Sequence, residues 1–113
     1  MQVVNKTNER ILAEHVRKAD NFFSRLKGLL FSPPLETGQG LLIIPCSSIH
    51  CFGMSYPIDA VFFNKKQIVV GLVESLKPCQ VSAIYWRAHG CLELPAGMIK
   101  HHGVALGDQL IIN

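Results

Sequence analysis

Charged residues are scarce in this sequence. Eleven Lys or Arg and eight Asp or Glu make up 17% of its 113 residues, whereas about a quarter is usual in globular proteins. Apolar residues make up 49%. Disordered chains are poor in apolar residues and rich in charge, so this composition excludes a disordered protein. Two interpretations remain: the surface is unusually neutral, or a partner covers part of it.

Long apolar runs and a targeting segment are also absent. The apolar runs, such as residues 40–45, fall far short of the ~18–20 residues that a helix needs to cross a bilayer, so we expect no membrane partner. Residues 2–10 are polar and lack the apolar core of a secretory signal, which favours a cytoplasmic protein. The net charge of +3 comes from scattered basic residues, which argues against a nucleic-acid partner.

The four cysteines form no Cys-x-x-Cys pair. They are Cys46, Cys51, Cys79 and Cys91, and their spacing excludes a thioredoxin-like motif and a zinc ribbon. In a reducing cytosol we expect four partly buried thiols. Nothing else in the sequence indicates a cofactor, so none is expected.

The apolar pattern predicts a mainly β (α+β) fold in one domain, residues 1–113. Residues 2–4 and 10–16 resemble a hairpin, and apolar residues at helical spacings predict a helix over 21–30. A second, short helix is predicted over 96–102. The remaining strands are expected at 41–44, 49–54, 58–63, 68–73, 80–85, 88–94 and 109–112. About seven or eight short strands with one or two short helices indicate a compact, barrel-like domain.

Two carboxylates stand alone in apolar surroundings. Asp59 is the only formal charge in residues 38–64, and Glu93 is the only one in residues 88–99. Because burying an unpaired charge is expensive, each must either face water or have a partner. The candidate partners of Asp59 are Arg25 and His50.

Three other patterns suggest chemistry. His89, Cys91 and Glu93 share one face of a strand, but they would need His50 or Cys46 to complete a tetrahedral metal site. Adjacent residues of a strand point to opposite faces, so a nucleophile and base at positions 50 and 51 cannot pair directly. Residues 94–98 join a strand to a helix, where unpaired backbone N–H groups can hold a phosphate or a carboxylate.

Three blocks of the sequence resemble a known family. They are residues 25–31 (RLKGLLF), residues 48–63 (SIHCFGMSYPIDAVFF) and residues 92–97 (LELPAG), the last followed by Gly107-Asp108. In order and spacing these blocks resemble the domain of unknown function 192, over nearly the whole chain. The resemblance implies a compact β-rich domain and no particular reaction. Its motif positions in this chain are Arg25, His50, Met54, Asp59, Glu93 and Gly97.

The leading hypothesis is a non-enzymatic ligand-binding or protein-interaction module. Its polar cleft would be framed by Arg25, His50, Asp59 and Glu93, with Gly97 at the rim, and Arg25 would orient Asp59. The partner would be a small ligand or a protein, and self-association stays open. One alternative is a small hydrolase or lyase that uses Asp59 and Glu93 as acid and base, which requires both to meet in one pocket. Another is a metal site made by His50, His89, Cys91 and Glu93.

Overall fold

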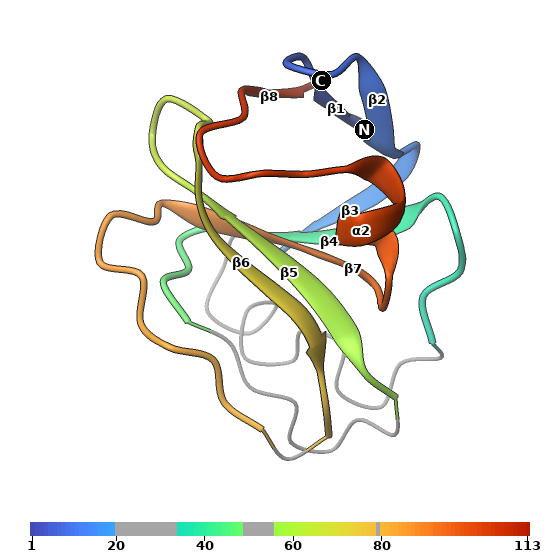
Figure 1. Cartoon of the computed structure of the whole chain (residues 1–113), viewed down its shortest axis with the longest axis vertical. Coiled ribbons are helices and arrows are strands. Elements are labelled where there is room, and N and C mark those ends of the chain that lie inside the picture. Colours follow the sequence, from blue (N-terminus) through green and yellow to red (C-terminus); the bar gives the residue numbers. More distant parts are fainter. Residues whose placement is uncertain (20–33, 49–55, 79) are drawn as a thin grey trace.

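The computed structural model describes residues 1–19, 34–48, 56–78 and 80–113 (Figure 1). These residues form eight strands and one helix. In chain order the elements are β1 (Val3–Asn5), β2 (Arg10–Ala13), β3 (His15–Ala19), β4 (Gln39–Ile43), β5 (Ile58–Phe63), β6 (Val69–Leu76), β7 (Gly90–Pro95), α2 (Met98–His102) and β8 (Leu110–Ile112). The prediction of a mainly β fold is confirmed.

The strands form two sheets. One has five strands in the order β3-β4-β7-β5-β6, and the other has three in the order β2-β1-β8. The β3–β4 pair is parallel, and the other pairs are antiparallel. Within the described ranges neither sheet closes on itself, so two open sheets replace the predicted barrel-like arrangement.

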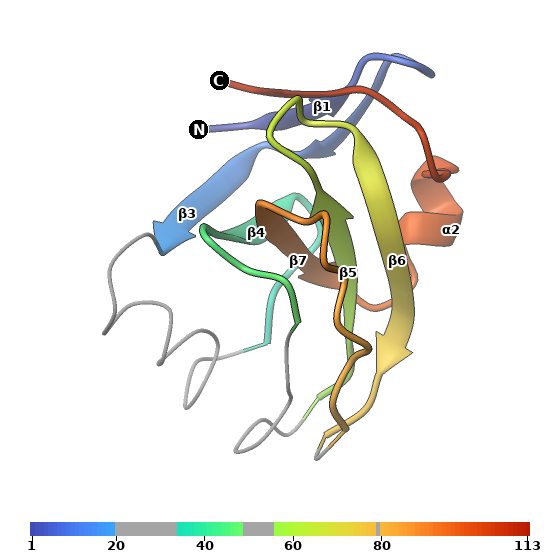
Figure 2. The same ribbon diagram turned by 90° about the vertical axis from the view of Figure 1, so that its left-hand side faces the viewer.

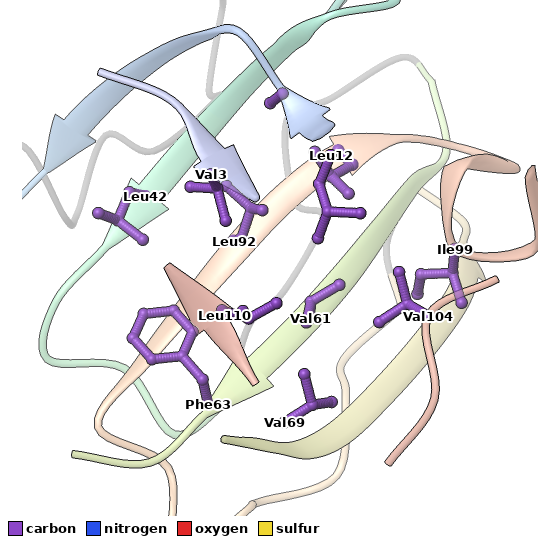
Figure 3. Packing of buried hydrophobic residues seen from close by; sticks show 12 residues of the cluster. Val3, Leu12, Leu42, Val61, Phe63, Val69, Leu92, Ile99, Val104 and Leu110 are labelled. Atoms are coloured by element: carbon purple, nitrogen blue, oxygen red, sulfur yellow. The ribbon is translucent and has the colours of Figure 1, made fainter. Parts of the chain in front are cut away.

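The main core lies between the two sheets (Figure 3). Val3, Leu12 and Leu110 of the three-stranded sheet pack against side chains of the five-stranded sheet, and Ile99 of α2 joins the same cluster. The three-stranded sheet and α2 therefore cover one face of the five-stranded sheet, which we call the core face (Figure 2). Each large side chain buried there contributes about 1.5–3 kcal/mol.

The opposite face of the five-stranded sheet, which we call the second face, is apolar too. Its buried residues are Ala19, Leu41, Ile43, Ile58, Ala60, Phe62, Leu76 and Cys91. Every residue of β5 is buried, because alternate side chains enter the core face and the second face. A strand buried on both faces agrees with its sequence, which is apolar on both sides except at Asp59.

The predicted strand at residues 80–85 is wrong. These residues belong to an irregular segment between β6 and β7. Val81, Ala83 and Tyr85 alternate as in a half-buried strand, but Val81 is 60% exposed and Ser82 is buried, while Tyr85 packs against the second face. The Tyr85 ring stacks on that of Phe62, with the ring centroids 4.5 Å apart. The alternation of apolar residues in this segment therefore does not match which side chains are buried.

Several predicted elements agree closely with the structure. The strand at 58–63 coincides with β5, and the short helix at 96–102 corresponds to α2, Met98–His102. The predicted helix at 21–30 and strand at 49–54 lie outside the described residues. No helix in the described part of the chain is long and apolar enough to cross a membrane.

Candidate functional site

The two isolated carboxyl groups point to opposite faces of the five-stranded sheet. β5 and β7 pair so that Asp59 faces Leu94 and Ala60 faces Glu93. Directly paired residues share a face, and successive residues alternate. Asp59 therefore points to the core face, and Glu93 points to the second face. An acid–base mechanism that needs both carboxyl groups in one pocket is incompatible with this register.

Asp59 is fully buried and bound by backbone N–H groups. Its Oδ1 accepts a hydrogen bond from the Ser75 N–H at 2.8 Å. Its Oδ2 accepts hydrogen bonds from the N–H groups of Gly97 at 3.1 Å and Ile99 at 2.9 Å. These hydrogen bonds hold β6 and the start of α2 to the centre of β5, which is a structural role.

Local backbone geometry brings these donors to Asp59. Ile58 pairs with Leu76 and Ala60 with Val73, so β6 bulges opposite Asp59. Ser75 lies in this bulge with φ 51°, and Gly97 precedes α2 with φ 92°, a conformation that favours glycine. A junction such as that of β7 and α2 can hold a phosphate or a carboxylate, and here it holds the protein's own Asp59 carboxyl group.

Glu93 lies in β7 with only 3% of its surface exposed. It pairs across the sheet with Leu41 on β4 and Ala60 on β5, both apolar residues of the second face. Its Oε2 atom is buried, and no described residue forms a hydrogen bond with it. Glu93 therefore differs from Asp59 in its hydrogen-bond donors: three described N–H groups donate to Asp59, and none donates to Oε2 of Glu93.

Burial controls the protonation of Glu93. Desolvation first, and the nearby charge of Cys46 second, raise its pKa from 4.5 to about 8. At pH 7 the side chain is therefore mostly the neutral acid. A protonated carboxyl group offers one O–H donor and keeps acceptor capacity.

Two thiols lie beside Glu93. Cys91 is fully buried on the same face of β7, and burial, followed by a hydrogen bond with Cys46 and the charges of Cys46 and Glu93, raises the pKa of the Cys91 thiol. The half-buried Cys46 donates its S–H to the Ser48 carbonyl oxygen at 3.2 Å. Glu93 and the two thiols thus form a weakly polar group within an apolar face, and we call it the Glu93 site.

The predicted metal set is not assembled by the described residues. Among them no group of three or more His, Cys, Asp or Glu side chains could hold a metal ion. His50, which the hypothesis requires, lies outside the described residues. His89 directly precedes β7, and its backbone N–H donates a hydrogen bond to the carbonyl of Phe63, the last residue of β5, at 2.7 Å.

The structure divides the predicted polar cleft. Asp59 and Gly97 are joined by a hydrogen bond, whereas Glu93 lies on the other face. Arg25 and His50 are outside the described residues, so the orientation of Asp59 by Arg25 stays a prediction. Backbone donors already occupy three of the roughly four acceptor positions of that carboxylate.

Sequence reasoning missed one buried polar pair, Asn5 and Asp108. The Asn5 side-chain amide donates to Asp108 Oδ2 at 2.7 Å, and the Ala105 N–H donates to the same atom at 2.9 Å. The pair ties the first strand to the chain before β8. Gly107-Asp108 is part of the third family block, but no local pattern points to its partner Asn5, because that residue lies 103 positions from Asp108 in the sequence.

Comparison with known proteins agrees with the resemblance of the sequence blocks. The model of the DUF192 family, described as "Uncharacterized ACR, COG1430", matches residues 3–112. The chain belongs to the DUF192 family. Its two central carboxyl residues, Asp59 and Glu93, are thus buried residues of a DUF192 domain.

Relatives of this DUF192 chain include proteins named UPF0127. The chain is 32% identical over 113 residues to a UPF0127 protein of Pyrococcus furiosus, covering 96% of this chain and 95% of that protein. It is 29% identical over 113 residues to a UPF0127 protein of Thermococcus sibiricus, covering 96% and 72%. A crystal structure of a protein of unknown function from Novosphingobium aromaticivorans shares the fold, with a TM-score of 0.85, 20% identity and coverage of 99% and 84%.

Proposed function

We propose that this chain is a non-enzymatic binding module and that the carboxyl group of Glu93 recognises its ligand. The buried Oε2 atom, which lacks a hydrogen-bond donor among the described residues, carries this proposal. Buried polar atoms in native proteins nearly always have a partner. Asp59, Asn5 and Asp108 follow that rule, so the exception at Glu93 supports a role in binding. Arg25 and His50 remain predicted members of the site.

The surroundings of Glu93 suggest the class of ligand. Leu41, Ala60 and Cys91 are apolar neighbours on the second face. A neutral carboxyl group in such surroundings suits an apolar molecule, or an apolar chain segment, that brings one N–H or O–H donor to Oε2. Asp59 cannot act on the same ligand, because it points to the core face. This separation favours binding over acid–base catalysis.

Two small probes of similar shape test the proposal. Butyramide and butylammonium both carry a propyl tail and N–H donors, but only the second is charged. We expect at least one of them to raise the melting temperature of the wild-type protein and to move the carboxyl carbon signal of Glu93 in NMR spectra. Butyramide should bind the neutral acid, whereas butylammonium must displace its proton and should bind better as the pH approaches 8.

Matched variants decide whether Glu93 is responsible. Glu93→Leu keeps an apolar side chain and removes the carboxyl group, so it should lose the response to both probes. Glu74→Gln, at an exposed position of β6, should retain it. The proposal is wrong if neither probe affects the wild type, or if Glu93→Leu responds as the wild type does.

A further inference from the structure

The segment between β6 and β7 exposes an unusual share of apolar surface. Val81 is 60% exposed, Ile84 is 52% exposed and Trp86, the only tryptophan of the chain, is 85% exposed. Single exposed apolar residues are normal on protein surfaces. Three within six consecutive residues form a cluster, which is typical of an interaction surface.

The backbone holds Trp86 in a fixed position. The Ala88 N–H donates to the Tyr85 carbonyl at 2.8 Å, which closes a turn with Trp86 and Arg87 at its two central positions. Tyr85 anchors this turn, since its N–H donates to the Ser47 carbonyl at 2.8 Å and its ring stacks on Phe62.

The anchor is also tightly packed. A Cβ atom on Gly71 would lie 2.4 Å from the Tyr85 ring, so the ring rests directly on the backbone of β6. Ile84 and Trp86 flank Tyr85 in the sequence and are exposed while its ring is turned to the sheet. The turn therefore presents Trp86 without the entropy cost of ordering a loose loop.

We propose that the turn at residues 85–88, with Ile84, is a docking surface for a protein partner that has an apolar pocket edged by carboxylates. Trp and Arg are the residue types that most often dominate binding at protein interfaces, and here they are neighbours. Arg87 is the only formal charge in residues 78–92, so this segment brings one cation and no carboxylate to the surface. A pocket for Trp86 with an acidic group for Arg87 is its complement.

A lipid surface fits these observations less well. Anionic membranes attract clusters of about four to eight Lys or Arg, whereas Arg87 stands alone in its segment. An exposed side chain on an anchored turn also suits a concave pocket better than a fluid interface. This docking proposal is independent of ligand binding by Glu93, because it is drawn from exposed residues of the segment between β6 and β7.

Site-specific crosslinking tests the proposal. The photoreactive residue benzoylphenylalanine is placed at position 86, at position 84, and at the control position 106, where Leu106 is 65% exposed and lies outside the segment. In the cells that make this protein, we expect one protein to be crosslinked from positions 84 and 86 and not from position 106. Identical products at all three positions, or no product at 84 and 86, would contradict the proposal.

Binding by the purified, crosslinked protein completes the test. We expect it to shift the emission of Trp86, the only tryptophan of this chain, to shorter wavelength once the partner's own emission is subtracted. By calorimetry, Trp86→Ser should weaken binding at least ~30-fold and Arg87→Glu at least ~10-fold, while Leu106→Ser changes it less than ~2-fold. Unchanged binding by Trp86→Ser, or the same emission shift with phosphatidylcholine–phosphatidylglycerol vesicles alone, would overturn it.

Discussion

Asp59 and Glu93 lie on neighbouring strands, one residue apart in register, and both are buried. Three backbone N–H groups bind the carboxylate of Asp59, whereas the buried Oε2 of Glu93 has no described donor. The comparison teaches that burial alone does not decide the state of a carboxyl group. Hydrogen-bond donors within the fold distinguish the two groups, because they satisfy the oxygens of Asp59 and leave Oε2 of Glu93 without a described partner.

The same difference explains how each group tolerates burial. Three backbone N–H groups donate hydrogen bonds to the carboxyl oxygens of Asp59, and these bonds offset the desolvation of that buried group. Glu93 has no such compensation, so desolvation raises its pKa to about 8 and the group stays neutral at pH 7. The core face thus holds a carboxyl group that fastens the fold, and the second face holds one whose buried Oε2 has no described donor.

The largest effect is expected from removing the satisfied carboxylate. Asp59→Ala leaves the N–H groups of Ser75, Gly97 and Ile99 without an acceptor. We expect the free energy of unfolding, measured with urea, to fall by about 3–5 kcal/mol. The matched control Glu74→Ala, at an exposed position of β6, should change it by less than ~0.5 kcal/mol. If both variants lost the same free energy of unfolding, Asp59 would not stabilise the fold more than an exposed carboxyl group does.

Glu93 should behave in the opposite way, and its effect should depend on pH. The unfolded chain releases the Glu93 proton near pH 4.5, while the native state keeps it up to about pH 8. Between these values the native state binds more protons, so stability falls as the pH rises. At about 1.4 kcal/mol per pKa unit, the loss amounts to a few kcal/mol by pH 8.

Glu93→Gln removes this titration. The free energy of unfolding is measured for both proteins from pH 4 to pH 9. Relative to the wild type, the variant should become steadily more stable as the pH rises from 4.5 to 8. The pH-independent part of the difference reports only the exchange of a carboxyl for an amide group. A wild-type curve and a variant curve that run parallel would contradict the assignment of Glu93 as a neutral acid.

Asp108 extends the comparison to a third buried carboxyl group. Like Asp59 it has donors, namely the Asn5 side chain and the Ala105 N–H. Asp108→Ala should cost about 2–3 kcal/mol of unfolding free energy, because both donors lose their acceptor. Amide exchange should also become faster in β1 and β8 than in β5. If Asp108→Ala lowered the free energy of unfolding by less than ~0.5 kcal/mol, hydrogen-bond donors alone would not make a buried carboxyl group important for stability.

The smallest effect concerns the second cause of the Glu93 pKa. The charge of Cys46 adds to desolvation, so Cys46→Ala should lower the pKa of Glu93 below about 8 without returning it to 4.5. A carboxyl carbon NMR titration measures this shift, and Leu106→Ala at a distant exposed position serves as the control. A complete return to 4.5 would mean that burial is not the main cause.

The sequence predicted the parts of the fold that follow local patterns. The strand at 58–63 was recognisable because five of its six residues are apolar, and the helix at 96–102 because Pro95 and Gly103 frame it. Instead of a barrel-like arrangement the described strands form two open sheets, since sheet closure depends on which strands become edges. The strand at 80–85 was wrong for a similar reason: local pattern cannot show that Val81 is exposed while Tyr85 packs on the sheet.

The candidate site was predictable only in part. Charge placement alone singled out Asp59 and Glu93, and both are buried. Their separation could not be predicted, because it depends on the register between β5 and β7, and a shift of one residue exchanges the faces. The partners of Asp59 were also hidden, since backbone N–H groups of Ser75, Gly97 and Ile99 carry no signature in side-chain chemistry.

The pKa of Glu93 in the wild-type protein tests the central claim most directly. A carboxyl carbon NMR titration of protein labelled at glutamate, with Glu93→Gln to assign the signal, measures it without any ligand. The account predicts a midpoint near 8, where an unpartnered and buried acid stays neutral at pH 7. A midpoint near 4.5 would show that Glu93 is ionised at pH 7 and stabilised by groups within the fold. That result would contradict the proposal that its neutral carboxyl group binds a donor of the ligand.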